Sequence, residues 1–339
     1  MHWFDDFEIR RFEVKGAHIH ARVSRGQCGN RPALLLLHGF PQTHVMWHRV
    51  AQRLQQNFYL VMPDLRGYGD SGKPAALPDH SSYCKRSMAQ DMVEVMGQLS
   101  IDRFGLCGHD RGGRVAHRLA VDHADRVFKL CVIDIVPTMD VYAGNWGTSL
   151  NGGQSPNASL LGSDPHLALG SDPQSPTHHL PRYFELAQAY YHWFHLTQPE
   201  PLPETMIGGN ALAYLHQKLG GWGTGGMGHL EPAALAEYER CFIKPETIHA
   251  VCEDYRAGAS IDLVHDQASR TAGQKIACDT LVLWGAKGVV NRLFAPLALW
   301  QAQCTGAVTG EALEAGHFIP EEMPQETPRH LANFFSGSC

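Results

Sequence analysis

The stretch GHDRGGRVAHR at residues 108–118 places a carboxylate where many hydrolases carry a nucleophilic serine. Asp110 stands in the pattern G-x-nucleophile-x-G and follows the apolar residues of RFGLC at 103–107. This pattern is typical of a sharp turn between a buried strand and a helix, on which the middle side chain projects above the carboxyl end of a sheet. The helix start offers free N–H groups and the positive end of its dipole. We therefore interpret Asp110 as a nucleophile.

A carboxylate nucleophile suits a different reaction from a serine. It attacks a saturated carbon that bears a leaving group, and the product is an ester whose carbonyl belongs to the enzyme. Water then cleaves this ester at the carboxyl carbon of Asp110, so that catalysis takes two displacement steps. Asp110 therefore indicates an alkyl halide or an epoxide as the substrate class.

The second step needs a base and an acid that orients it. His317, in EAGHF, follows the last predicted strand, which is the position of the base in hydrolases of this chain order. The segment WGAKGVVN at 284–291 contains no Asp or Glu, so we assign the orienting acid to Asp134 in VIDIVPT. Asp134 would hold the ring of His317 in the productive tautomer.

The loop HGFP at 38–41 supplies the remaining part of this site. It follows a buried strand and can turn a backbone N–H toward the nucleophile. The N–H groups of Phe40 and Arg111 together would form an oxyanion hole with two donors.

Two arginines follow the nucleophile at once. A cation at a helix N-terminus is disfavoured by about 0.3–1 kcal/mol, and Arg111 and Arg114 share one face of the first turn. One hypothesis is a bidentate clamp on a substrate carboxylate, which would also keep Asp110 ionised. The alternative is that both arginines pair with nearby acids such as Asp110. Because both flank the nucleophile, we favour the clamp.

The elements that position these residues alternate between apolar strands and helical patterns, which indicates an α/β fold with a mostly parallel sheet covered by helices on both faces. Alternation within 5–25 predicts an N-terminal antiparallel hairpin. Strands are predicted at 33–40, at the start of 58–72, and at 103–110, 128–138 and 280–286, with a last strand before EAGHF at 314–318. Helices are predicted at 85–99, 111–122 and 292–304.

The alternation stops after the Asp134 strand. Residues 141–180 are rich in Gly, Ser, Asn and Pro, which predicts a long irregular insertion. Residues 181–260 show helical patterns rich in aromatics. We therefore expect an α/β core built from 1–140 and 271–339, with a helical cap at 141–270.

Composition excludes several classes of function. A formal net charge of −6 gives no basic field for nucleic acid. The N-terminus lacks the features of a secretory signal, and no apolar run is as long as a membrane span. Nine scattered cysteines without metal-ligand spacing indicate free thiols in the cytoplasm. We expect no metal and no cofactor.

Several motifs together resemble the fluoroacetate (haloacetate) dehalogenases of the α/β-hydrolase fold, and DRGGR with the cap pair His-Trp is the most specific part. The resemblance covers nearly the whole chain except about 141–180. It implies hydrolysis of fluoroacetate or chloroacetate to glycolate and halide, with Arg111 and Arg114 on the substrate carboxylate. The motifs are HGFPQTHVMW at 38–47, DLRGYGDS at 64–71, GHDRGGRVAHR at 108–118, YYHWF at 190–194, EDYRAGASID at 253–262 and GHFIPEE at 316–322.

Fluoride leaves poorly because it is strongly hydrated, so a dry site must replace water with hydrogen-bond donors. The resemblance implies that His192, Trp193 and Tyr238 bind the halide. From the residues alone, each could equally pack a helical core. Trp222, in LGGWG, would form a further pocket wall. The competitors of Tyr238 for this role are Tyr190, Tyr191 and Tyr214.

Two alternative functions remain. An epoxide hydrolase would use the same triad, with Tyr190 or Tyr191 and Tyr238 protonating the epoxide oxygen. A neutral epoxide has no use for two arginines, and such hydrolases usually carry Trp after the nucleophile, which this chain does not. The second alternative is a catalytically silent α/β hydrolase that only binds a ligand.

The expected partner is a small anionic haloacid, and neither nucleic acid nor a membrane is expected to bind. A homodimer is one possible assembly. The insertion at 141–180 is interpreted as a surface loop, with a flap over the site as the alternative.

Overall fold

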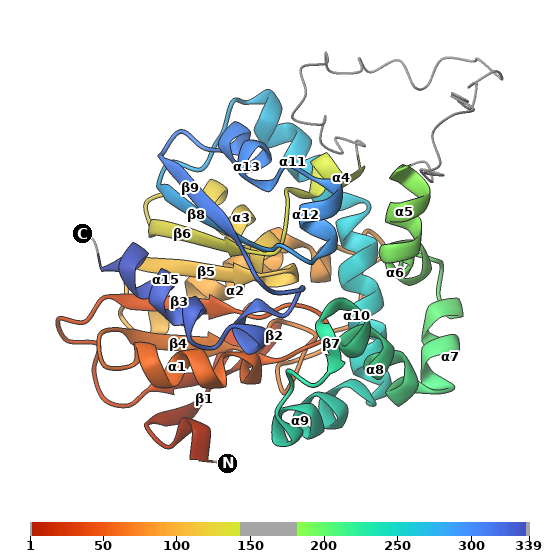
Figure 1. The fold of residues 1–339 in the computed structure, drawn as a ribbon, viewed down its shortest axis with the longest axis horizontal. Helices are drawn as coiled ribbons and strands as arrows, with labels where there is room; N and C mark the ends of the chain where they lie inside the picture. The colour runs from red at the N-terminus through yellow and green to blue at the C-terminus, as the bar shows by residue number, and fades with distance from the viewer. Residues whose placement is uncertain (1, 143–181, 337–339) are drawn as a thin grey trace.

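The computed structural model describes residues 2–142 and 182–336. Within them, eight strands form one sheet in the order β1-β2-β4-β3-β5-β6-β8-β9 (Figure 1). Strands β1 and β2 pair antiparallel, as predicted for the N-terminal hairpin, and β2 also pairs antiparallel with β4. The other neighbours in the sheet, from β4 through β3, β5, β6 and β8 to β9, pair parallel. The strands are β1 (Phe7–Val14), β2 (Ala17–Ser24), β3 (Ala33–Leu37), β4 (Tyr59–Pro63), β5 (Phe104–His109), β6 (Val127–Ile133), β8 (Asp279–Gly285) and β9 (Val308–Leu313).

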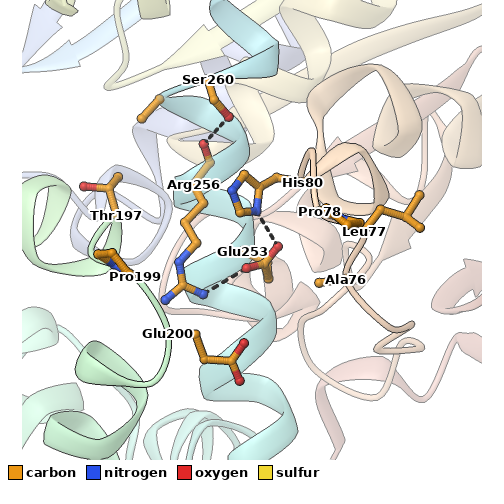
Figure 2. A pocket seen from close by; sticks show the side chains of 11 residues that line it. Ala76, Leu77, Pro78, His80, Thr197, Pro199, Glu200, Glu253, Arg256 and Ser260 are labelled. Carbon is orange, nitrogen blue, oxygen red and sulfur yellow. Dashed lines mark hydrogen bonds and ion pairs between the residues drawn. The ribbon is translucent and has the colours of Figure 1, made fainter.

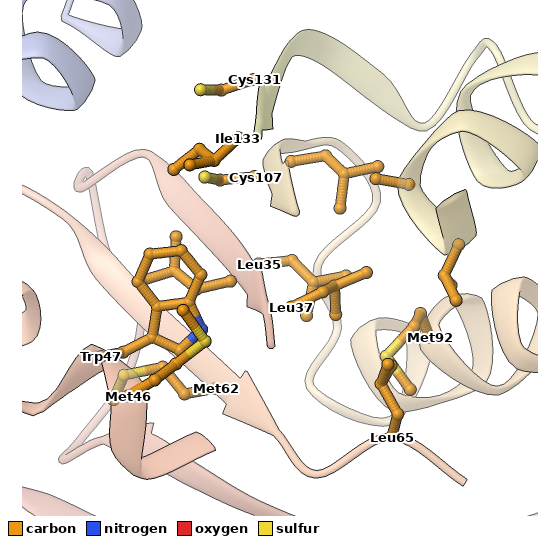
Figure 3. Close-up of a cluster of buried hydrophobic side chains, with 14 of the residues drawn as sticks. Leu35, Leu37, Met46, Trp47, Met62, Leu65, Met92, Cys107, Cys131 and Ile133 are labelled. Atoms are coloured by element: carbon orange, nitrogen blue, oxygen red, sulfur yellow. The ribbon is translucent and has the colours of Figure 1, made fainter. Parts of the chain in front are cut away.

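Helices cover both faces of this sheet, so its central strands are buried along their whole length. Strands β3, β4 and β5 have no exposed residue, which is why they are continuous apolar runs rather than alternating ones. Figure 3 shows part of the core, where Leu35 and Ile133 of the sheet lie among Trp47, Met92 and other apolar side chains. The covering helices are α1 (His48–Leu54), α2 (Lys85–Gln98), α3 (Arg111–Asp122), α13 (Pro296–Gln303) and α15 (Glu326–Phe335).

The predicted helix at 292–304 is divided in the structure. Helix α12 spans Val289–Leu293, and α13 begins at Pro296. Proline has no backbone N–H and disfavours helical geometry in the residue before it, so a helix readily starts at Pro296 but does not run through it.

A helical cap lies between β6 and β8, as predicted for the segment after Asp134. In Figure 1, helices α5 to α9 gather on one side of the sheet. The irregular segment predicted at 141–180 lies almost entirely outside the described residues. The elements of this region are α4 (Thr138–Tyr142), α5 (Arg182–Ala189), α6 (Tyr191–Leu196), α7 (Leu202–Gly208), α8 (Ala211–Trp222), β7 (Thr224–Met227), α9 (Pro232–Phe242), α10 (Pro245–Gly258) and α11 (Ile261–Thr271).

Two further features of the described residues concern membrane-spanning helices and cysteines. None of their helices has the length and apolar character needed to cross a lipid bilayer. The cysteines in the same ranges are free thiols.

Candidate active site

Asp110 occupies a strained turn between β5 and α3. Its φ of 48° lies in the left-handed region, which a residue with a side chain rarely adopts. The flanking glycines allow the strand and the helix to approach closely, because a Cβ on Gly108 would lie 2.4 Å from the carbonyl oxygen of Gly112. The turn therefore holds the Asp110 side chain at the carboxyl end of the sheet, where the sequence motif predicted it.

The loop after β3 reaches this carboxylate. Oδ1 of Asp110 accepts a hydrogen bond of 3.0 Å from the backbone N–H of Phe40. A Cβ on Gly39 would lie 2.5 Å from Cβ of Asp110, so only glycine permits this approach. The N–H of Arg111, the second predicted donor, belongs to the first residue of α3, where a helix leaves its N–H groups without intrahelical partners.

The side chains of His317 and Asp134 are hydrogen-bonded to each other close to Asp110. Nδ1 of His317 lies 2.6 Å from Oδ2 of Asp134, and the other oxygen of Asp134 accepts the N–H of Gly285 at 2.9 Å. Asp134 is 1% exposed and has a φ of 48°. Burial raises the pKa of Asp134, although its bond with His317 acts in the opposite direction. Burial lowers the pKa of His317, but the bond and charge of Asp134 outweigh it and the net shift is upward.

The other ring nitrogen of His317 faces the nucleophile. Nε2 lies 3.9 Å from Oδ2 of Asp110, which is too long for a direct hydrogen bond. It is buried and has no hydrogen-bond partner among the described residues. The base candidate thus directs its free nitrogen at the carboxyl group whose ester it would help to hydrolyse.

Arg111 does not pair with Asp110. Its Nε and Nη2 bind the two carboxylate oxygens of Asp254, each at 2.8 Å, and its guanidinium lies 4.2 Å from the ring centre of Tyr255. Burial raises the pKa of Asp254, but Arg111 and Lys85 reverse this and hold it well below its usual range. Two of the nitrogens expected to clamp a substrate are therefore already bound to an internal acid.

Arg114 is held differently. Its Nη1 donates to Oγ1 of Thr138 at 2.5 Å, and its guanidinium lies 4.8 Å from the ring centre of Trp193. It is 4% exposed and forms no ion pair with any described residue. Its Nε is buried and has no hydrogen-bond partner among the described residues. The alternative hypothesis, pairing of both arginines with nearby acids, therefore describes Arg111, which binds Asp254, but not Arg114, which forms no ion pair with a described residue.

A small cavity joins these core residues to the cap. It measures about 20 Å³ as the space open to the centre of a water molecule, which is room for about one water. The predicted cap residues His192, Trp193 and Trp222 all line it, and the rings of His192 and Trp222 are 4.7 Å apart. Its lining consists of Asp110, Asp134, Ile135, Tyr190, His192, Trp193, Trp222, Val289 and His317.

Tyr238 does not reach this cavity. Its hydroxyl donates to Oε1 of Glu321 at 3.0 Å and accepts from Nε2 of Gln42 at 3.4 Å. The predicted assignment of Tyr238 to a halide site is therefore corrected. It is a buried tyrosine of α9 that packs against the core, and burial beside this network raises the pKa of Glu321 to about 8.

Tyr255, on α10, packs next to His192, a residue that lines the cavity, although Tyr255 is not itself part of the lining. Its ring is 5.4 Å from that of His192 and 5.5 Å from that of Phe40. Burial and then the charge of Asp110 raise its pKa. The motif EDYRAG contains both Asp254 and Tyr255, and a buried acid beside an aromatic residue in a helix was the signal that could have found them.

A larger hollow, of about 430 Å³, shares Tyr190 and Trp193 with this cavity, whereas another lies away from Asp110. Figure 2 shows this other hollow, of about 570 Å³, between the core and the cap, where His80 and Arg256 each bind the carboxylate of Glu253. The loop residues Leu77 and Pro78 form one wall. The other acid of its lining, Glu200, is exposed and lies 3.8 Å from His249. None of the lining residues lines the cavity at Asp110.

Two groups of three described residues have the atom types of metal ligands, and neither includes a residue that lines the cavity. In one group Nδ1 of His44 already binds Oδ1 of Asp64 at 2.8 Å. In the other, the Lys85 ammonium lies 3.5 Å from Oδ2 of Asp262, which disfavours a cation there. The groups are His20, His44 and Asp64, and Cys84, Asp262 and His265.

Comparison with known proteins identifies the fold and the family of this chain. A family model for the α/β-hydrolase fold matches residues 32–153. The fluoroacetate dehalogenase of a Burkholderia species is 37% identical over 335 residues, which cover 99% of this chain and 96% of that protein. The chain belongs to the fluoroacetate dehalogenase family of the α/β-hydrolase fold. It is thus a hydrolase of this fold.

This member of the fluoroacetate dehalogenase family is also similar to proteins described as epoxide hydrolases and to another α/β hydrolase. The soluble epoxide hydrolase of Corynebacterium sp. (strain C12) is 27% identical, with 91% of each chain covered. A crystal structure from Nostoc sp. PCC 7120, described as an α/β hydrolase, is 45% identical with a TM-score of 0.83, and the match covers 99% of this chain and 100% of that one. A Pseudomonas aeruginosa structure described as an epoxide hydrolase is 34% identical with a TM-score of 0.78, covering 98% and 96%.

Proposed function

We propose that this protein hydrolyses the carbon–halogen bond of small haloacids, converting fluoroacetate or chloroacetate to glycolate and halide. A carboxylate oxygen of Asp110 attacks the carbon that bears the halogen. The new C–O bond forms as the carbon–halogen bond breaks, and the halide leaves with the bonding electrons. The product of this step is an ester between Asp110 and the two-carbon acid.

One observation carries the proposal. Arg114 is a buried guanidinium without a carboxylate partner among the described residues, and it interacts electrostatically with the Asp110 carboxylate, although it does not itself line the cavity. An unpaired buried cation is costly unless an anion joins it. A haloacid brings a carboxylate to Arg114 and a reactive carbon to Asp110, whereas a neutral substrate would leave the cation unpaired.

Arg111 has a narrower role than first expected. Asp254 occupies its Nε and Nη2, so Nη1 is the nitrogen left for the substrate carboxylate. Because Asp254 and the Tyr255 ring hold the guanidinium in place, Arg111 would bind without first ordering its side chain. The clamp is then shared between Arg111 and Arg114.

In the second step, Nε2 of His317 takes a proton from a water molecule that attacks the carboxyl carbon of the ester. Asp134 orients the ring and stabilises the imidazolium that forms. The oxyanion of the tetrahedral intermediate is stabilised by the N–H groups of Phe40 and Arg111. Collapse of this intermediate breaks the bond to the glycolate oxygen, which takes up the proton held by His317 as glycolate leaves. Asp110 then loses the proton that came with the attacking water and is again a carboxylate, so the net products are glycolate, halide and one proton.

The leaving group would be bound by donors from the cap. Cavity residues His192 and Trp193, together with Tyr255, carry N–H or O–H groups that can bind a halide as charge develops on it. The cavity has room for about one water molecule and must enlarge to admit any substrate, and an acid of two carbons requires less enlargement than a bulky substrate. It also limits the water that would compete for these donors.

Epoxide hydrolysis is the second candidate, because relatives described as epoxide hydrolases share the fold and Tyr190 lines the cavity. Tyr238, the second tyrosine expected for that reaction, is bound to Glu321 instead. A neutral epoxide also leaves Arg114 without an anion. A silent binding protein would need none of the arrangement between Asp110, Asp134 and His317.

The test is a side-by-side assay of fluoroacetate, chloroacetate and styrene oxide, read out as free halide and as diol. We expect halide release from the acids alone, and diol formation would instead support the epoxide candidate. The variant His317→Ala should form the ester but not release it, so intact-mass measurement after exposure to chloroacetate should show one added carboxymethyl group. An unmodified mass, or continued turnover by Asp110→Asn, would contradict the two-step mechanism.

A further inference from the structure

We infer that Glu322 is a positioning residue for the base, and that it fixes the loop of His317 to the cap. This inference rests on the proposed function, because it assigns Glu322 to the second step of that reaction. It concerns a carboxylate that lies outside the triad and does not line the cavity.

The carboxylate of Glu322 accepts hydrogen bonds from both residues that flank the base. Oε2 accepts the backbone N–H of Gly316 at 2.9 Å, and Oε1 accepts the backbone N–H of Phe318 at 2.9 Å. Oε2 also accepts the backbone N–H of Thr224 at 3.0 Å and its hydroxyl at 2.6 Å. One side chain thus binds the base loop at two points and strand β7 of the cap at two more.

The backbone of His317 itself is held by two other groups. Its N–H donates to the carbonyl oxygen of Trp222 at 2.9 Å, at the end of cap helix α8. Its carbonyl oxygen accepts from Nε2 of His109 at 2.8 Å. Three consecutive N–H groups, from Gly316 to Phe318, therefore all have fixed acceptors, and two of these acceptors belong to Glu322.

The contact between the cap and the base loop is close as well as polar. A Cβ on Gly316 would lie 2.5 Å from the carbonyl oxygen of Trp222 and 3.1 Å from Oε1 of Glu322. Burial raises the pKa of Glu322, but the bonds from Thr224, Gly316 and Phe318 outweigh it and lower that pKa, so the carboxylate stays charged and accepts all four bonds.

The effect on catalysis follows from the order of the two steps. Attack by Asp110 does not use His317, whereas hydrolysis of the ester does. A displacement of about 1 Å can cost about 10²-fold in rate. A loosened base loop should therefore slow ester hydrolysis and leave halide release in the first turnover nearly unchanged. A residue that merely stabilised the fold would not separate the two steps in this way.

The experiment compares Glu322→Gln with Thr224→Val and with Glu314→Gln as the matched control. Glutamine keeps the shape of the side chain but presents an NH2 group to N–H donors. Valine removes one of the four bonds. Glu314 is an exposed carboxylate two residues before Gly316 and pairs only with the exposed Lys287 in the described structure.

With chloroacetate, Glu322→Gln should give a burst of about one halide per active site, followed by turnover about 10–100-fold slower than in the wild type. Intact-mass measurement should show the ester accumulating. Thr224→Val should show a smaller change in the same direction, and Glu314→Gln should behave as the wild type. Ester hydrolysis at the wild-type rate in Glu322→Gln, or an equal slowing of both steps, would overturn the inference.

A second readout does not depend on turnover. The proton between His317 Nδ1 and Asp134 should give a low-field ¹H NMR signal in the wild type, and Glu322→Gln should shift or broaden it. A wild type that releases no halide would refute the proposed function, while the NMR comparison would still test the positioning of His317. An unchanged signal in a folded Glu322→Gln protein would refute the role of Glu322.

Discussion

The base loop and the cap helices face the same cavity, but their polar groups are satisfied to very different degrees. Around His317, the backbone N–H, the carbonyl and Nδ1 all have partners, and both oxygens of Asp134 are bonded. Only Nε2, the atom that would take the proton, is buried without a partner in the described structure. This side of the site is ordered before a substrate arrives.

The cap side carries buried polar atoms that have no hydrogen-bond partner among the described residues. Within α6 and α8, these are Nδ1 of His192, both ring nitrogens of His195, the hydroxyl of Tyr214 and Nζ of Lys218. Lys218 is fully buried, and its ammonium lies 3.5 Å from the ring centre of Tyr191 and 5.2 Å from that of Trp222. Buried donors without protein partners are rare in folded proteins and call for an explanation.

The difference matches the two chemical tasks. A base must be held at one geometry through the reaction, so full hydrogen bonding is useful there. A halide site must bind a charge that develops only as the bond breaks, and of the unsatisfied cap atoms named above only Nδ1 of His192 belongs to a residue that lines the cavity. The comparison predicts that changes on the base side affect ester hydrolysis, and that changes on the cap side affect halide release or stability.

The largest effect is expected from Asp134→Asn. The amide removes the charge that stabilises the imidazolium and favours the wrong tautomer of His317, so ester hydrolysis should fall by about 10³–10⁴-fold. Single-turnover decay of the ester measures this directly. First-step halide release should persist. A rate of ester hydrolysis within tenfold of the wild type would remove Asp134 from the base side.

A smaller effect is expected from Tyr255→Phe, which tests the cap side. Loss of one donor to the developing halide should slow halide release by about 10²-fold, and more for fluoride than for chloride because fluoride depends more on hydrogen bonds. The rate of the halide burst with the two haloacetates gives the comparison.

Tyr238→Phe is the matched control for this prediction. It should leave the halide burst nearly unchanged and lower the free energy of unfolding by about 1–2 kcal/mol, because the buried Glu321 loses a donor. If Tyr238→Phe slowed halide release and Tyr255→Phe did not, the assignment of the halide tyrosine would revert to Tyr238.

The contrast between these tyrosines shows how far the sequence could be interpreted. Asp110 and His317 were found because a strand end and a glycine-flanked turn are local features, and helix α3 spans the predicted residues 111–122. Whether Tyr238 or Tyr255 packs against the cavity residue His192 depends on how α9 and α10 pack against the core. That packing joins residues far apart in the chain, and no local pattern specifies it.

The same limit applies to charge. The sequence placed Arg111 and Arg114 at the helix start, but the partner of Arg111 is Asp254, 143 residues away. The role proposed for Glu322 has the same origin, because its bonds to Thr224 span 98 residues. Local chemistry predicts the reacting atoms, and tertiary packing determines what holds them.

Lys218→Met is expected to change the stability of the protein rather than a catalytic rate, and it tests a buried cap residue whose ammonium has no hydrogen-bond partner among the described residues. Burial lowers the pKa of Lys218 to about 7. The unfolded chain keeps its proton to a much higher pH, so between about pH 7 and pH 10 the unfolded state binds more protons than the folded one. The stability of the wild type should therefore rise with pH in this window, by at most about 1.4 kcal/mol per pH unit from this group.

Methionine fills a similar volume without a charge, so Lys218→Met should be more stable than the wild type near pH 6.5, by about 1–3 kcal/mol, and the difference should shrink toward pH 9. Urea unfolding at the two pH values measures both quantities. A constant difference, or a variant less stable than the wild type at pH 6.5, would mean that the cation–π contacts with Tyr191, Tyr214 and Trp222 fully offset the buried charge. The cap would then be as well satisfied as the base loop, through aromatic rings instead of hydrogen bonds.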